Sequence, residues 1–150
     1  MALDSFPTDR NKPVIALAFD FGTQRIGVAS GQSLTGTAET AAVLKANDGI
    51  PNWDEIEALI SEWQPNLFVV GLPYNLDGSE SNLLPRAIKF GNRLNGRFHK
   101  PTYGMDERLS SRAASERLAN TGQRQNEKIY IDDIAAQIIL ENWLAELRGF

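Results

Sequence analysis

The stretch that decides the fold is Val14-Ile15-Ala16-Leu17-Ala18-Phe19-Asp20, a continuous apolar run that ends in a carboxylate. A segment that is apolar at every position is typical of a central strand covered on both faces. Asp20 would then stand at the carboxyl end of a buried strand, at the edge where open α/β sheets bind their ligands. We therefore expect a layered α/β protein with a functional residue at Asp20.

The rest of the chain supplies elements that can surround this strand. After a turn at Gly22-Thr23, strands are expected over 26–29 and 37–45, which complete an antiparallel meander. Further elements are expected in the order helix 53–63, strand 67–70, helix 82–97, strand 101–105, helix 110–119 and helix 131–147. The chain shows no internal repeat, so we expect one domain over 14–150 and a flexible N-terminal arm over 1–13.

Composition excludes several classes of chemistry. The absence of cysteine excludes thiol nucleophiles, thiolate zinc sites and disulfides, and the single histidine, His99, lies in a polar segment expected at the surface. No apolar run is long enough for a membrane span or forms a signal core in residues 1–13, so a cytoplasmic protein is expected. With a net charge of −4, any contact with a polyanion must be local.

Acidic residues stand at three separate places next to expected elements. Besides Asp20, the pair Asp106-Glu107 follows the strand expected over 101–105, and Asp132-Asp133 opens the last helix. Carboxylates that come close together repel one another unless a cation or protons neutralise them, and they are the hard oxygen ligands that divalent ions prefer. The pattern favours a metal site, although Asp20 also fits a turn and one of the last two acids fits a helix N-terminus.

Basic residues gather on one expected helix. Four of them fall within an arc of about 80° at 100° per residue: Arg86, Lys89, Arg93 and Arg97. Arg108 and Arg112 follow the acidic pair, and Asn75 and Asp77 occupy the loop after strand 67–70, where they can line a cleft. The stripe is a candidate phosphate track, with a merely solvated face as the alternative, and the loop is equally compatible with an ordinary connection.

Four segments together resemble the bacterial YqgF/RuvX family. They are Asp20-Phe21-Gly22-Thr23-Gln24-Arg25-Ile26-Gly27-Val28-Ala29, Gly71-Leu72-Pro73-Tyr74-Asn75-Leu76-Asp77-Gly78, Asp106-Glu107-Arg108-Leu109-Ser110 and Asp132-Asp133-Ile134-Ala135-Ala136. The resemblance implies a ribonuclease-H-like α/β fold related to the resolvase RuvC, with a five-stranded mixed sheet of three antiparallel and then two parallel strands. It also implies a nuclease that matures the 5′ end of pre-16S ribosomal RNA.

Carried over by position, the resemblance assigns catalysis and metal binding to Asp20, Glu107 and Asp132, with Mg²⁺ or Mn²⁺ as the cofactor. Asp106 and Asp133 remain open as further ligands, and Gln24 and Asp133 depart from residues frequent in the family. The implied partner is nucleic acid, either precursor rRNA or branched DNA. The protein is expected to act as a monomer or homodimer and not to associate with a membrane.

Two rival interpretations come from other classes. Asp20-Phe21-Gly22-Thr23 also resembles the phosphate loop of sugar kinases and actin-like ATPases, but those proteins need a second comparable domain and this chain is too short for it. The second rival is a nucleic-acid-binding factor that has the same fold and does not cut. This alternative stays open, because metal ligands make catalysis possible without showing that the protein turns over a substrate.

Overall fold

Strands and helices follow one another in the expected order, with one short strand added. The computed structural model describes residues 3–74, 77, 79, 81–106 and 127–148, with side chains in the last helix from 134 onward. The elements are β1 (Ile15–Asp20), β2 (Arg25–Gln32), β3 (Thr37–Asn47), β4 (Ile50–Pro51), α1 (Trp53–Trp63), β5 (Leu67–Leu72), α2 (Leu84–Phe98), β6 (Thr102–Asp106) and α4 (Glu127–Leu147). The helix expected over 110–119 lies outside the described residues.

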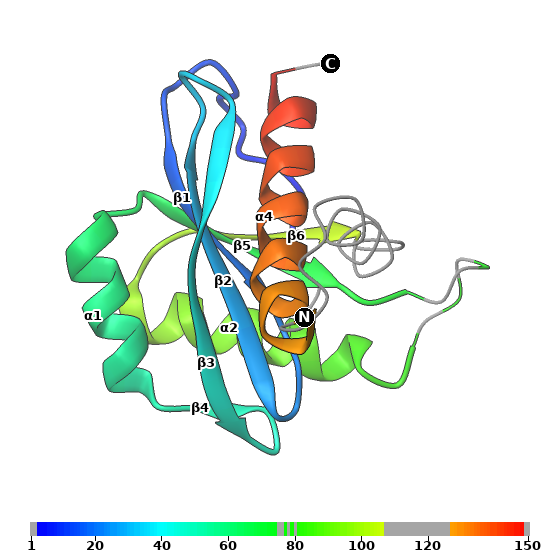
Figure 1. Cartoon of the computed structure of the whole chain (residues 1–150). Helices are drawn as coiled ribbons and strands as arrows, with labels where there is room; N and C mark the ends of the chain where they lie inside the picture. The colour runs from blue at the N-terminus through cyan, green and yellow to red at the C-terminus, as the bar shows by residue number, and fades with distance from the viewer. Residues whose placement is uncertain (1–2, 75–76, 78, 80, 107–126, 149–150) are drawn as a thin grey trace.

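The strands form one mixed sheet in the order β4-β3-β2-β1-β5-β6 (Figure 1). β1, β2, β3 and β4 pair antiparallel, whereas β5 and β6 run parallel to β1. The predicted three antiparallel and two parallel strands are therefore confirmed. The sixth strand, β4, was missed because two residues, one of them Pro51, are too short to show a period.

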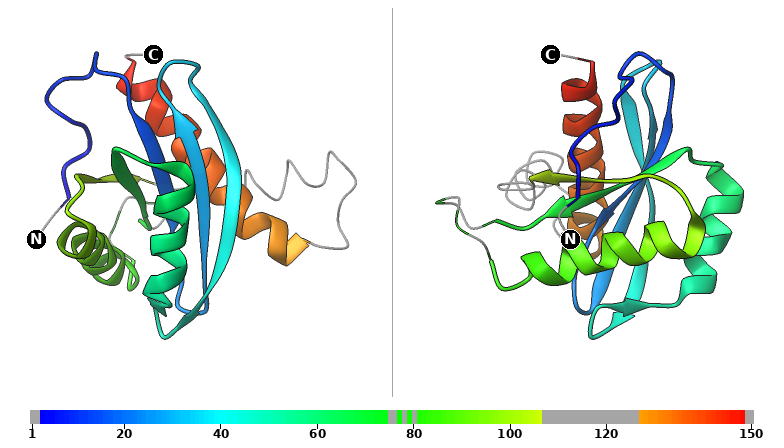
Figure 2. Two further views of the ribbon diagram at one scale, coloured as in Figure 1. Left: turned by 90° about the vertical axis from the view of Figure 1, so that its left-hand side faces the viewer. Right: turned by 180° about the vertical axis from the view of Figure 1, so that it is seen from behind.

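Two hydrophobic cores lie on opposite faces of the sheet. Leu17 and Phe19 of β1 point into the core under α1 and α2, while Ala16 and Ala18 point into the core under α4. Figure 2 shows the sheet between these two layers. The small alanine side chains let α4 approach closely enough to bury Trp143 completely. The all-apolar run of β1 thus follows from its position between two helix layers.

The N-terminal segment packs along the free edge of β6. The Gly104 N–H donates a hydrogen bond to the carbonyl oxygen of Asp4 at 2.8 Å, and Leu3 packs over the same glycine. Phe6 stacks on Trp143 of α4 with a ring separation of 5.7 Å. The flexibility predicted for residues 1–13 stays a prediction, and these are the contacts that such motion would have to break.

Candidate active site at the carboxyl edge of the sheet

Asp20 is the last residue of β1 and lies at the carboxyl edge, the edge of the sheet where β1, β5 and β6 end. It pairs with Gly27 of β2, and the preceding Phe19 pairs with Val70 of β5. Because side chains alternate along a strand and Ala18 points toward α4, the Asp20 side chain belongs to the α4 face. The carboxylate is half-buried there, on a strand whose backbone is paired on both sides.

Asp106 ends β6 at the same edge but on the opposite face. Its partner in β5 is Leu72. Tyr103 and Met105 pack against the core under α4, so alternation puts the exposed Asp106 side chain on the α2 face. Two strand spacings, roughly 10 Å, separate β6 from β1 across the sheet. Asp20 and Asp106 therefore share an edge without sharing a face.

The last helix brings its acidic residues to the same end of the molecule. Arg148, just after the end of α4, lies against Gly36 in the β2–β3 turn, and Gln137 of α4 donates a hydrogen bond to the Ala38 carbonyl at 3.0 Å. That turn is at the end of the sheet opposite Asp20, so α4 runs from the Asp20 end toward it (Figure 1). The side chains of Asp132 and Asp133 are outside the described residues.

α4 starts earlier than the sequence pattern indicated. It begins at Glu127, four residues before the expected start at about 131, so Asp132 and Asp133 stand in its second turn. The helix-dipole explanation of these acids is weakened, because that effect fades beyond the first turn.

The described residues include only part of the predicted site. Glu107, Arg108, Arg112 and Asn75 lie outside the described residues. Among the residues that are described, no three histidine or acidic side chains form a group able to hold a metal ion. Asp77 is described, and its Oδ1 accepts hydrogen bonds from the Ser79 N–H at 2.9 Å and from the Ser79 hydroxyl at 2.6 Å. This is a local turn, which fits the interpretation of the loop as an ordinary connection.

The turn after Asp20 is tied to the turn between β3 and β4. Gly49 donates its N–H to the Thr23 carbonyl at 2.9 Å, and Ala46 donates to the Gln24 carbonyl at 2.8 Å. Gly22 has to be glycine because a Cβ there would lie 2.5 Å from the Arg25 carbonyl oxygen. The packing of the chain itself therefore accounts for this glycine.

The basic stripe of α2 divides into two kinds of residue. The Arg86 guanidinium donates to the carbonyl oxygen and to Oδ1 of Asp48, both at 2.8 Å. The Arg97 guanidinium lies 4.3 Å from the centre of the Trp53 ring. Lys89 and Arg93 are exposed and form no ion pair within the described part of the chain. Half of the stripe thus supports the fold, and the other half faces solvent.

Lys89 and Arg93 border a hollow close to the carboxyl edge. This basic hollow has a volume of about 240 Å³ and is lined by Phe21, Asp48, Gly49, Ile50, Arg86, Lys89, Phe90 and Arg93. Sequence reasoning found its cations from their helical spacing. It missed Asp48 and Ile50, whose positions depend on how the β3–β4 turn docks on α2.

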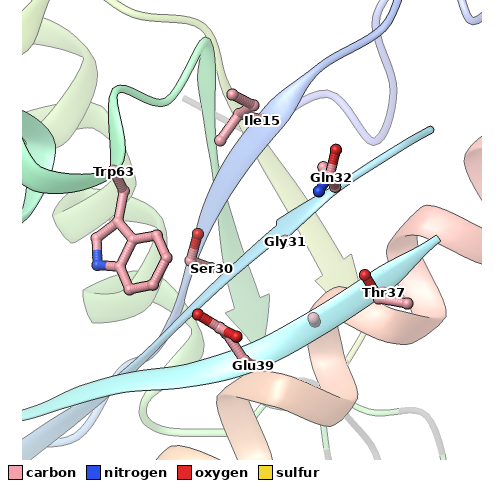
Figure 3. A pocket seen from close by; sticks show the side chains of 8 residues that line it. Ile15, Ser30, Gly31, Gln32, Thr37, Glu39 and Trp63 are labelled. Atoms are coloured by element: carbon pink, nitrogen blue, oxygen red, sulfur yellow. The ribbon is translucent and has the colours of Figure 1, made fainter. Parts of the chain in front are cut away.

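A second hollow, of about 290 Å³, lies at the other end of the sheet (Figure 3). Trp63 forms one wall, and Ile15, Ser30 and Glu39 contribute from the strands. Ile15 begins β1 and so lies at the opposite end of the strand from Asp20. This second hollow is therefore separate from the candidate active site.

His99 and Trp53 lie outside the candidate active site. His99 is exposed in the left-handed region just after α2, as predicted for a surface residue. Trp53 stacks on buried Phe90 at 5.9 Å, which places it on the core side of α1. In the described ranges, none of the helices has the length and apolar character needed to cross a bilayer.

The fold identifies the class of protein to which the chain is similar. The structure is similar to that of T. thermophilus RuvC in complex with a Holliday junction substrate, with a TM-score of 0.52, 14% identity and coverage of 90% of this chain and 96% of that chain. It is also similar to the fowlpox virus Holliday junction resolvase, with a TM-score of 0.50, 14% identity and coverage of 88% and 97%. The chain has the ribonuclease-H-like α/β fold of the resolvases.

The sequence then defines the family. Residues 14–146 match the RuvX family, described as "Holliday junction resolvase", and the chain belongs to it. A protein of Aeromonas hydrophila is 54% identical over 134 residues, which cover 89% of this chain and 96% of that protein. One of Pseudomonas aeruginosa is 54% identical over 139 residues, with coverage of 91% and 96%. Both carry the name "Putative pre-16S rRNA nuclease". The resemblance inferred from the four segments is confirmed.

Proposed function

We propose that this member of a nuclease family is a metal-dependent endonuclease that hydrolyses phosphodiesters in structured nucleic acid, with the 5′ end of pre-16S rRNA as its main substrate. The observation that carries the proposal is the position of Asp20, a half-buried carboxylate fixed at the carboxyl edge of the sheet. The names of relatives that match at 54% identity over about nine-tenths of both chains support this substrate. Maturation of ribosomal RNA would take place in the cytoplasm.

Asp20, Glu107 and Asp132 would hold Mg²⁺ or Mn²⁺. A carboxylate set fits these hard cations. Asp106 has its side chain on the face opposite to Asp20, which leaves its neighbour Glu107 as the acid of the pair able to join Asp20. α4 covers the Asp20 face, so an acid near the start of this helix can join Asp20, and the family position makes Asp132 that acid. When bound, such ions would supply an activated water and neutralise charge on the phosphate.

The chain's own residues would position the substrate. β1 is hydrogen-bonded to β2 on one side and to β5 on the other, so the Asp20 backbone is held more rigidly than a loop residue would be. Lys89 and Arg93 belong to the opposite face of the same edge, so they would bind backbone phosphates of a substrate that crosses the edge, away from the cut itself. Arg108, Arg112 and Asn75 would add contacts, whereas Arg86 and Arg97 would act mainly by supporting the fold.

A cleavage assay tests this proposal. The substrate is a transcript containing the 5′ leader and the first stem of 16S rRNA, incubated with the purified chain and Mg²⁺. Wild-type protein should cut the leader, chelation with EDTA should stop it, and Asp20→Asn should lower the rate by at least about a hundredfold. An Asp20→Asn protein that cuts at the wild-type rate would remove Asp20 from the mechanism.

Resolution of branched DNA is the second candidate function. The family description and the fold shared with RuvC favour it. A four-way DNA junction in the same assay separates the two candidates, because cleavage of this junction at a higher rate than the RNA leader would make DNA the preferred substrate. If the protein binds either probe but shows no metal-dependent cleavage, the result would instead support the alternative that it is a nucleic-acid-binding factor without nuclease activity.

A further inference from the structure

The β3–β4 turn presents an apolar side chain beside the cations of the basic hollow. We propose that Ile50 is a wedge that inserts between bases where a nucleic-acid duplex meets a single strand. The Arg86–Asp48 contact holds this wedge in position. This inference rests on the proposed function, because it specifies the shape of the substrate that the same edge would recognise.

The turn that carries Ile50 is fixed on two sides. Asp48 and Gly49 both have left-handed backbone conformations, with φ of 52° and 84°. The Gly49 N–H donates to the Thr23 carbonyl at 2.9 Å, and Arg86 donates two hydrogen bonds of 2.8 Å to Asp48. Ile50 is therefore presented from a braced turn, which lowers the entropy cost of using it in binding.

Glycine at position 49 is required for this bracing. A Cβ there would lie 2.8 Å from Cζ of Phe21, in addition to the strain of a positive φ. Phe21 directly follows Asp20 and is itself buried. The turn is therefore seated on the residue next to the proposed metal ligand.

The surroundings of Ile50 are complementary to nucleic acid. Its side chain is 51% exposed, and it lines the basic hollow together with Arg86, Lys89 and Arg93. A single exposed apolar residue is ordinary in itself. Arg86 is paired with Asp48, so Lys89 and Arg93 give the hollow its net positive charge, in a chain with a net charge of −4. Phosphates would bind the cations while the apolar tip enters the base stack.

The wedge lies close enough to Asp20 to influence where the chain cuts. Thr23 follows Asp20 by three residues, so their Cα atoms are at most about 11 Å apart. Gly49 is hydrogen-bonded to Thr23, and both turns lie side by side at one end of the sheet (Figure 1). The Thr23–Gly49 contact and one further residue extend this span to at most about 20 Å between Asp20 and Ile50. At about 3.4 Å per nucleotide along a duplex, this corresponds to up to roughly six nucleotides. A duplex end fixed at Ile50 would set the cut a few nucleotides away.

The wedge is tested directly by measuring whether the protein unstacks the base at the point where a duplex meets a single strand. The probe is an RNA stem with a 5′ single-stranded flank and 2-aminopurine at the terminal base pair, mixed with protein in EDTA so that no cleavage occurs. Wild-type protein should raise the 2-aminopurine fluorescence and bind this RNA about tenfold more tightly than a continuous RNA duplex of equal length. Ile50→Ser should lose both the rise and the preference, while its affinity for the continuous duplex stays unchanged.

Leu34→Ser is the matched control. Leu34 is 71% exposed, and it lies in the β2–β3 turn at the opposite end of the sheet. This variant should behave like wild type, which separates a wedge from a general effect of removing a surface apolar residue. Ile50→Val should keep most of the fluorescence rise, and Arg86→Gln should reduce it by releasing the turn.

The outcomes separate this inference from the proposed function. A wild-type protein that unstacks the junction but cuts nothing in Mg²⁺ would support the wedge and refute the nuclease. A protein that cuts while Ile50→Ser unstacks the junction as wild type does would overturn the wedge alone. Equal wild-type affinity for the junction and the continuous duplex would also overturn it.

Discussion

Asp106 and Glu107 are neighbours in the sequence, and β6 ends at Asp106. Asp106 is on the α2 face, away from Asp20. We therefore predict that Glu107→Gln lowers the cleavage rate at least about a hundredfold, whereas Asp106→Asn stays within about threefold of wild type. Single-turnover rates on the RNA leader measure both. A larger loss in Asp106→Asn than in Glu107→Gln would exchange the two roles.

Asp132 and Asp133 offer a second matched pair. Both stand in the second turn of α4, and neighbouring residues of a helix point about 100° apart, so only one of them can face the sheet squarely. Asp132→Asn should abolish cleavage and Asp133→Asn should not. Titration calorimetry should show that the variant that loses cleavage also loses Mn²⁺ affinity. If Asp133→Asn is the inactive variant, Asp133 is the ligand.

Sequence could predict some of these residues and not others. Asp20 was found because it ends an apolar run that only a buried strand explains. The contact between Arg86 and Asp48 was not found, because the partners are 38 residues apart and meet only after the β3–β4 turn docks on α2. The face occupied by Asp106 needed the observed register of β6, which a short strand does not reveal by itself.

At the scale of single elements, helix α2 carries two kinds of basic residue. Arg86 and Arg97 contact other parts of the fold, whereas Lys89 and Arg93 face solvent. Lys89→Glu together with Arg93→Glu should weaken binding of duplex DNA and reduce the magnitude of its log–log salt slope by about 0.9 for each phosphate that the variant no longer neutralises. Fluorescence anisotropy over a range of salt concentrations gives the slope. If affinity and slope are unchanged, the exposed half of the stripe is a solvated face.

Arg97 should behave differently from Lys89 and Arg93. Its stacking on Trp53 is expected to stabilise the attachment of α2 to α1 by about 0.5–1 kcal/mol. Arg97→Gln should therefore lower the free energy of unfolding by about this amount and leave the salt slope nearly unchanged. Urea denaturation checks the first effect, and a reduction of the slope equal to that of Arg93→Glu would contradict this assignment.

The position of the N-terminal segment beside β6 should affect the pKa of Tyr103. Burial raises the pKa of Tyr103 above its usual 10.0, and the nearby Asp4 carboxylate raises it further. The folded state thus holds this proton more tightly than the unfolded state. Its contribution to stability is complete below pH 10.0 and is lost as the pH rises through the folded pKa.

Asp4→Asn should bring the pKa of Tyr103 closer to 10.0 and reduce this alkaline loss of stability. Ultraviolet difference titration of the phenol and thermal unfolding at alkaline pH measure the two effects. An identical phenol titration in wild type and Asp4→Asn would mean that Asp4 is not held beside β6 in solution. The predicted flexibility of residues 1–13 would then gain direct support.

Element boundaries show where pattern reasoning loses information. The helix predicted over 53–63 matches α1 to the residue. Asn52 caps its start by accepting the Asp54 N–H at 3.0 Å, and Pro65 follows its end. β2 extends past its predicted 26–29 to Gln32, since Ser30 and Gly31 pack in the sheet despite their weak strand preference. Tertiary pairing, rather than local propensity, lengthened this strand.

At the scale of the whole molecule, the layered fold follows from which residues are small and which are large. β1 alternates alanines toward α4 with Leu17 and Phe19 toward α1 and α2, and this difference sets the depth of each core. The sequence therefore predicted a strand buried on both faces. It did not predict that Trp143 would donate its indole N–H to the Ser5 carbonyl at 2.7 Å, because that pairing spans nearly the entire chain.

The central claim is that Asp20, Glu107 and Asp132 meet at one metal site on the carboxyl edge. The most direct measurement is anomalous diffraction from crystals of the chain grown with Mn²⁺. We predict a Mn²⁺ peak with an Asp20 oxygen at about 2.1 Å and the three carboxylates within about 4–8 Å of one another. A Mn²⁺ peak away from Asp20, or Glu107 and Asp20 on opposite faces of the sheet, would contradict the nuclease mechanism.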